Sequence, residues 1–214
     1  TELPEHTEWN PEGGKGYFVT RNGSSLIAFR APVTGDFSGF MMTAAHGDSP
    51  CFKIKENAEM SDGHHLRLSV EKYGGMLCSS WTDRPLSVAG RVIVRAEGGI
   101  ATRLVDLAEP CAIIPNVAIH MDRTVNEGKK FNAQVDMLPL VGAADEQTHL
   151  LDLVAAQLDC DQEAIIGHDL FLYVRDEGRL WGLQDAFISA PRLDDLMCTF
   201  GALKGLLGGA HDTV

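Results

Sequence analysis

Residues 43–50 contain two side chains, His46 and Asp48, of types that bind or orient metal ions. The apolar run at residues 40–42 precedes them and is typical of a buried strand. Residues two apart in an extended chain point the same way, so we expect His46 and Asp48 to share one face. Imidazole is the commonest metal ligand, and a neighbouring carboxylate can orient its ring. The spacing favours a metal site without establishing one, because surface loops often contain His-x-Asp by chance.

Six short stretches, taken in order along the chain, resemble the sequence boxes of the aspartyl aminopeptidases, a family of two-metal zinc peptidases. They read TAAHGDSP (43–50), YGGML (73–77), WTDR (81–84), LSVAGRVIV (86–94), IPNVAIH (114–120) and FISAPRLDDL (187–196). Several boxes in register are far more specific than any one of them. Two positions depart from the family pattern: Gly47, where threonine is usual, and Asp195, where asparagine is usual. Neither departure removes a candidate ligand.

The resemblance implies a role for four residues. His46 and Asp194 become metal ligands, with Asp194 as the carboxylate between two zinc ions, and Asp48 becomes the catalytic carboxylate beside His46. Such a bridge is physically apt, because two cations about 3.5–4 Å apart need an anion between them. His120 is implied to reach the active site of a neighbouring subunit and to hold the substrate there.

The residues alone leave simpler interpretations open for the same side chains. Asp194 follows a proline at the start of a predicted helix, where an acid is favoured by the helix dipole. Asp195 is expected to be a solvated or capping acid, and His120 an ordinary histidine of a β-rich unit. His64 and His65 are expected to form part of a polar turn.

The family's remaining ligands and its general base are a Glu-Glu pair, a later Asp and a late His, all beyond the position of Asp194. The last glutamate of this chain is Glu177, and after Asp194 the only acidic residues and histidines are Asp195, His211 and Asp212. A zinc peptidase needs a base to activate the metal-bound water. We therefore expect this chain to be a segment of a longer enzyme and to be inactive alone.

Composition narrows the class of protein. The 214 residues are 44% hydrophobic with a formal net charge of −12, which argues against a nucleic-acid surface because phosphate binding needs clustered Lys and Arg. The five cysteines are scattered, without a Cys-x-x-Cys pair, as is typical of reduced thiols in a cytoplasmic protein. No apolar run approaches the roughly 20 residues of a membrane span, so we expect no membrane partner.

Local patterns predict an α/β protein with many short strands. We expect strands at residues 17–20, 26–29, 52–55, 66–70, 90–96, 100–107 and 170–174, the last paired with residues 180–183. A turn is expected at residues 36–39 and an internal ion pair between Asp83 and Arg84. Helical spacing predicts one helix at residues 150–158, capped by Asp145 or Thr148, and an amphipathic helix at residues 193–207.

The order of these elements matches the family's plan, an α/β catalytic domain interrupted by a β-rich, barrel-like dimerisation domain. We predict that residues 1–51 and 169–214 belong to the catalytic domain and residues 52–168 to the insertion. The implied function is a cytoplasmic, homodimeric or larger zinc aminopeptidase, with two ions per site, that releases N-terminal Asp or Glu from peptides. Two alternatives stay open: a non-catalytic assembly module with a vestigial metal site, and another zinc hydrolase such as a deacylase.

Overall fold

The computed structural model of the protein describes residues 1–33 and 39–209. The chain forms two compact units, which we call the terminal unit (Thr1–Asp48 with Arg192–Val214) and the central unit (Ser49–Pro191). The turn predicted at residues 36–39 falls largely outside the described residues, as do His211 and Asp212. No helix within residues 1–33 and 39–209 is long and apolar enough to cross a membrane.

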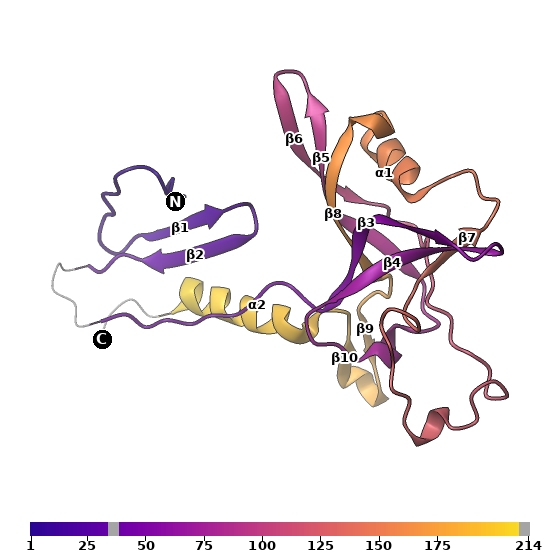
Figure 1. Ribbon diagram of the computed structural model, residues 1–214. Coiled ribbons are helices and arrows are strands. Elements are labelled where there is room, and N and C mark those ends of the chain that lie inside the picture. The colour runs from indigo at the N-terminus through magenta and orange to yellow at the C-terminus, as the bar shows by residue number, and fades with distance from the viewer. Residues whose placement is uncertain (34–38, 210–214) are drawn as a thin grey trace. The chain divides into compact units, whose positions relative to one another are not determined.

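The central unit is built on one six-stranded antiparallel sheet (Figure 1). Its strand order is β6-β5-β8-β3-β4-β7. The strands are β3 (Cys51–Ser61), β4 (His65–Tyr73), β5 (Leu86–Ala96), β6 (Gly99–Asp106), β7 (Leu140–Ala143) and β8 (Ile165–Val174). The alternating pattern of residues 52–55 and 66–70 and the hairpin at residues 97–99 therefore predicted real strands.

A short segment brings the two halves of this sheet together. Ala112 forms an antiparallel bridge with Leu86 of β5, and the next residue, Ile113, bridges Leu140 of β7. The backbone N–H groups of Ile113 and Leu140 donate to one another's carbonyls at 3.0 and 2.7 Å. The sheet is consequently close to closed, as the many short strands had indicated.

The core of the central unit follows the period-two pattern of its strands. Phe52 and Ile54 of β3 and Leu68 and Val70 of β4 are fully buried, whereas their neighbours point outward. The ring of Phe52 meets that of Trp81 edge-on at 5.1 Å. Fully burying side chains of this size stabilises the fold by about 1.5–3 kcal/mol each, which makes this cluster the main source of stability.

The remaining elements lie outside this six-stranded sheet. The central unit also has α1 (Leu150–Leu158), four 3-10 turns, η1 (Cys78–Trp81), η2 (Val125–Glu127), η3 (Gln162–Ala164) and η4 (Leu183–Asp185), and the strands β9 (Arg179–Trp181) and β10 (Phe187–Ser189). The terminal unit has the hairpin β1 (Gly16–Arg21) and β2 (Ser25–Arg30), and the helix α2 (Leu193–Gly208). Asn22 and Gly23 both have positive φ, as a tight hairpin turn requires, so the predicted Asn-Gly hairpin is confirmed.

The predicted pairing of residues 170–174 with residues 180–183 is wrong. β8 pairs instead with β5 over most of its length and with β3, because its alternate residues Leu170 and Leu172 fill the core. β9 pairs with β10. The central unit ends at Pro191.

The predicted cap of α1 is also wrong, since neither Asp145 nor Thr148 occupies that position. The N-cap is His149, whose backbone N–H donates to the Asp152 carboxylate at 2.8 Å. Glu59, from β3, accepts the N–H of Leu150 at 2.7 Å and lies 2.5 Å from Nδ1 of His149. A carboxylate far away in sequence therefore satisfies the helix start, which local spacing cannot reveal.

Gly90 of β5 lies against the backbone of β8, opposite Leu170. Its φ is +158°, and a Cβ placed there would lie 2.1 Å from the carbonyl oxygen of Asp169. We predict that Gly90→Ala lowers the free energy of unfolding by about 1–3 kcal/mol or more, because backbone atoms cannot move aside as side chains can. Urea unfolding followed by circular dichroism measures this. Gly167→Ala, in the same sheet with nothing within 4 Å of the added carbon, is the control and should have little effect.

The His149–Glu59 pair should make stability depend on pH. The neighbouring Glu59 carboxylate raises the pKa of His149 above its ordinary value. Stability from the pair is complete below the pKa of an unfolded histidine, about 6.5, and is lost as the pH rises through the higher folded pKa. The unfolding free energies of wild type and His149→Gln should therefore differ near pH 6 and converge by about pH 9. A His64→Gln control should show no such convergence; a constant gap for His149→Gln would contradict the assignment.

Candidate metal-ligand site

The segment that carries His46 is extended but forms no strand. Residues 40–42 have no β partner among the described residues, and Phe40, Met41 and Met42 are 79%, 85% and 88% exposed. The predicted buried strand is therefore wrong. An apolar run becomes a buried strand only when another strand pairs with it and a second layer covers it, and the described part of this chain supplies neither.

The predicted contact between His46 and Asp48 is present. Nδ1 of His46 lies 2.9 Å from the backbone carbonyl oxygen of Asp48 and 3.3 Å from its carboxylate oxygen Oδ1. Both side chains are more than half exposed. The ring is held mainly by the carbonyl, with the carboxylate as the second partner, which leaves Nε2 as the nitrogen that faces away from residue 48.

The start of α2 lies against His46 within the terminal unit. The carboxylate oxygen Oδ2 of Asp195 is 3.7 Å from Nε2 of His46 and accepts the backbone N–H of the same residue at 3.3 Å. We had predicted Asp194 in the first turn of a helix, but its φ of −88° and ψ of 115° are those of an extended residue. The regular helix begins after Asp195, whose carboxylate accepts hydrogen bonds from the thiol and the backbone N–H of Cys198. Asp195 is thus the capping acid that the sequence suggested.

Electrostatics follow from these contacts. The carbonyl of Asp48, followed by the carboxylates of Asp195 and Asp48, raises the pKa of His46 above its ordinary value. The Cys198 thiol, with the N–H and ring of His46, lowers the pKa of Asp195. The same carboxylate raises the pKa of the Cys198 thiol, so that this sulfur stays protonated near neutral pH.

The donors fit zinc in type but not in number. An imidazole and carboxylates are ordinary zinc ligands. However, within residues 1–33 and 39–209 no three His, Cys, Asp or Glu side chains are arranged to hold a metal ion. Asp194 directly precedes Asp195, so both predicted ligands, His46 and Asp194, lie near one point of the terminal unit. A complete site needs donors from elsewhere.

His120 lies in the central unit, in a turn where the N–H of Met121 donates to the carbonyl of Ala118. It is exposed, and so are its apolar neighbours Val117, Ile119 and Met121. The turn is therefore a surface loop that presents both a titratable ring and apolar side chains to solvent.

The WTDR box anchors the base of this loop. The carboxylate of Asp83 accepts the N–H of Asn116 at 2.8 Å, and the N–H of Asp83 donates to the carbonyl of Ile114 at 2.9 Å. Arg84 pairs with Asp176, so the predicted ion pair between Asp83 and Arg84 is wrong. Both charged residues of this box therefore have structural partners elsewhere in the central unit.

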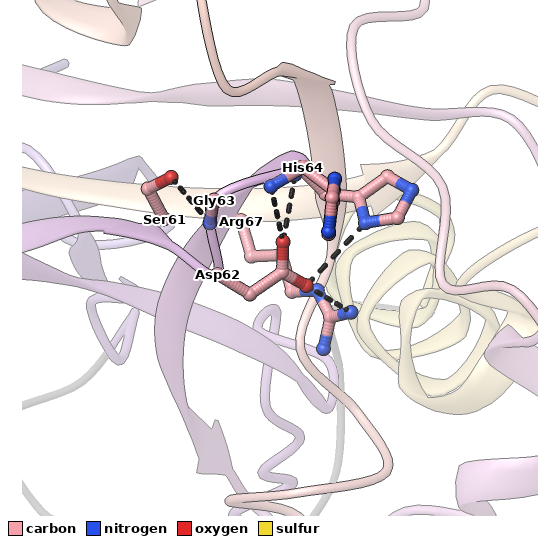
Figure 2. Close-up of polar contacts among 6 residues, drawn as sticks. Ser61, Asp62, Gly63, His64 and Arg67 are labelled. Atoms are coloured by element: carbon pink, nitrogen blue, oxygen red, sulfur yellow. Dashed lines mark hydrogen bonds and ion pairs between the residues drawn. The ribbon is translucent and has the colours of Figure 1, made fainter.

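His64 lies in the hairpin turn between β3 and β4, His65 is the first residue of β4, and the turn is organised by Asp62. Figure 2 shows its carboxylate accepting the N–H groups of His64 and His65 at 2.9 and 2.7 Å and pairing with Arg67 at 2.8 Å. These bonds, led by those from the two backbone N–H groups, lower the pKa of Asp62 to about 2. The carboxylate serves the turn rather than a metal ion.

Two residues beside His46 were missed as site residues. Asp195 was assigned only a capping role, although its carboxylate also contacts His46. Thr199 was not singled out, yet its hydroxyl donates to the carbonyl of His46 at 3.0 Å. Both residues lie at the start of α2, but nothing in the sequence says which loop the start of this helix contacts.

Comparison with known proteins covers the whole chain. The model of the family described as "Aminopeptidase I zinc metalloprotease (M18)" matches residues 1–214. The "Probable M18 family aminopeptidase 2" of Clostridium novyi (strain NT) is 43% identical over 217 residues, covering 96% of this chain and 49% of that protein. The protein of the same name from Pseudomonas aeruginosa (strain UCBPP-PA14) is 40% identical, covering 98% and 51%. The chain therefore spans about half the length of these relatives.

Comparison with solved structures gives relatives of the same kind. A chain of the Ape4 and Nbr1 complex, determined by cryo-EM, superimposes with a TM-score of 0.88 at 35% identity, covering 99% of this chain and 45% of that one. For Chaetomium thermophilum mApe1 the TM-score is 0.84 at 31% identity, covering 99% and 52%. The mApe1 of S. cerevisiae, solved as a dodecamer, gives 0.72 at 26% identity, covering 99% and 49%. The resemblance seen in the sequence boxes is confirmed: the chain belongs to the M18 family of aminopeptidase I zinc metalloproteases.

Proposed function

We propose that the protein acts as a zinc aminopeptidase with two metal ions per site and releases N-terminal Asp or Glu from peptides. The observation that carries this proposal is the arrangement of the His46 segment and the start of α2 in one unit, where an imidazole and acidic side chains meet. Family membership supports zinc as the metal. The preference for acidic residues rests on the sequence boxes alone.

In this proposal His46 and Asp194 hold metal, and Asp48 orients the His46 ring through Nδ1. Bound zinc would polarise the scissile carbonyl and activate a water molecule. Residues 52–168 would form the inserted dimerisation domain, in a cytoplasmic homodimer or larger assembly. The dodecamer of S. cerevisiae mApe1 supports a homo-oligomer without fixing its size.

Substrate choice tests the proposal directly. The natural protein, with whatever sequence adjoins this chain, should cleave peptides that begin with Asp or Glu with a kcat/KM at least about tenfold above that for peptides that begin with Leu or Ala. A site built to pair with a substrate carboxylate strongly rejects side chains that lack one. Equal rates on all four would leave an aminopeptidase without acidic preference. Release of acyl groups but not of amino acids would instead identify a deacylase.

For the 214-residue chain itself we predict weak zinc binding and no turnover of glutamyl or aspartyl peptides with added zinc. His46 and Asp194 are two ligands, fewer than the three of a typical catalytic site. Calorimetric titration of zinc should show weak binding that His46→Ala abolishes, whereas the control His64→Ala leaves it unchanged. Tight, stoichiometric binding or measurable turnover would show that other residues of this chain complete the site.

We predict that His120 acts on the substrate bound to a neighbouring subunit. In the natural protein, His120→Ala should lower turnover roughly a hundredfold or more, the effect of losing one hydrogen bond to a developing oxyanion. Metal content and assembly mass should not change, because His120 lies in an exposed turn. His64→Ala, also in an exposed turn, should keep full activity.

Mixing mutant subunits tests whether this action crosses between subunits. Neither His120→Ala nor His46→Ala subunits should work alone. Mixed assemblies can combine an intact His46 in one subunit with an intact His120 in its neighbour, so activity should return. If the subunits exchange and activity does not return, His120 does not act across the interface.

A further inference from the structure

Both backbone polar groups of His46 are bonded to side chains of α2. The N–H donates to Oδ2 of Asp195 at 3.3 Å, and the carbonyl accepts the hydroxyl proton of Thr199 at 3.0 Å. His46 lies in a segment without secondary structure, so no helix or sheet supplies these bonds. A residue whose backbone N–H and C=O are both hydrogen-bonded has little backbone freedom, so the direction of the Cα–Cβ bond of His46 is fixed.

The two α2 residues are suited to this task by their position. Asp195 directly precedes the regular turns of α2 and Thr199 lies within them, and both side chains reach the backbone of His46. The Asp195 side chain is only 17% exposed, against 57% for that of His46. Its carboxylate also caps the helix by accepting the backbone N–H of Cys198. The group that begins the helix therefore also holds the histidine, and any shift of α2 is passed to His46.

We infer that Asp195 and Thr199 are positioning residues, which hold His46 by its backbone so that its ring is presented for metal binding. This inference rests on the proposed role of His46 as a ligand. Asp195 needs its oxygen rather than its charge for this task, so asparagine at this position should serve equally well. Thr199 needs its hydroxyl and not its methyl group.

The hydrogen bonds are tested first, by NMR on the 214-residue chain without metal. Asp195→Ser keeps a good helix cap but is too short to reach His46, and should speed exchange of the His46 amide proton roughly threefold to tenfold. Asp195→Asn should keep the wild-type rate. Thr199→Val should shift the carbonyl ¹³C resonance of His46, and Thr199→Ser should restore it. Met197→Val, an exposed site on the same helix, is the control and should change neither signal.

Zinc titration then tests the positioning itself, read from the ring resonances of His46. Thr199→Val relative to wild type, and Asp195→Ser relative to Asp195→Asn, which lacks the same charge, should each raise the apparent dissociation constant about threefold or more, with Thr199→Ser close to wild type. Unchanged amide exchange and carbonyl shifts in Asp195→Ser and Thr199→Val would overturn the inference, as would zinc affinity that does not respond to them. If the wild-type ring does not respond to zinc while the backbone signals behave as expected, the proposed metal role of His46 fails and the backbone contacts stand.

Discussion

The pairing of β5 with β8 is the interaction on which the central unit depends. It places a strand from the end of the unit between β5 and β3, so that residues more than 70 positions apart in the sequence become neighbours. The pairing demands a glycine at position 90, because the backbone of Asp169 occupies the space that a side chain would need. The buried faces of β3, β4, β5 and β8 then form one continuous core, and the exposed loop of His120 is attached to its rim through Asp83.

The terminal unit is organised on a different principle, with few buried apolar residues and a small number of polar contacts. Arg30 of β2 donates to the carbonyl of Leu206 near the end of α2, and Asp195 and Thr199 bond to His46 near its start. Side chains of α2 such as Met197, Phe200 and Leu207 are exposed. The amphipathic helix was predicted correctly, but its apolar stripe is not covered by the described part of the chain.

Sequence patterns predicted those features that depend on neighbours in the sequence. The Asn22-Gly23 hairpin, the alternation in β3 and β4, the helix from Leu150 and the turn at Asp62 all follow from local spacing. The failures share one physical cause, which is a partner from a distant segment. The start of α1 is bonded to Glu59 rather than to the predicted cap. β8 pairs with β5 and β3 rather than with residues 180–183, and Arg84 pairs with Asp176 rather than with Asp83. The proposed metal ligands were selected through family boxes, whereas Thr199 belongs to no such local pattern.

The division of the terminal unit into two distant pieces has a consequence for how the chain folds. Asp48 and Arg192 are separated by the whole central unit, and closing an unstructured loop of roughly 140 residues would cost about 4 kcal/mol in chain entropy. Prior folding of the central unit shortens the path between them. Because α2 follows every strand of the central sheet in the sequence, the N-terminal hairpin cannot pack with α2 during synthesis until the whole central unit has been translated. We expect pulse-labelled amides of β5 and β8 to gain protection before that of His46; simultaneous protection would contradict this order.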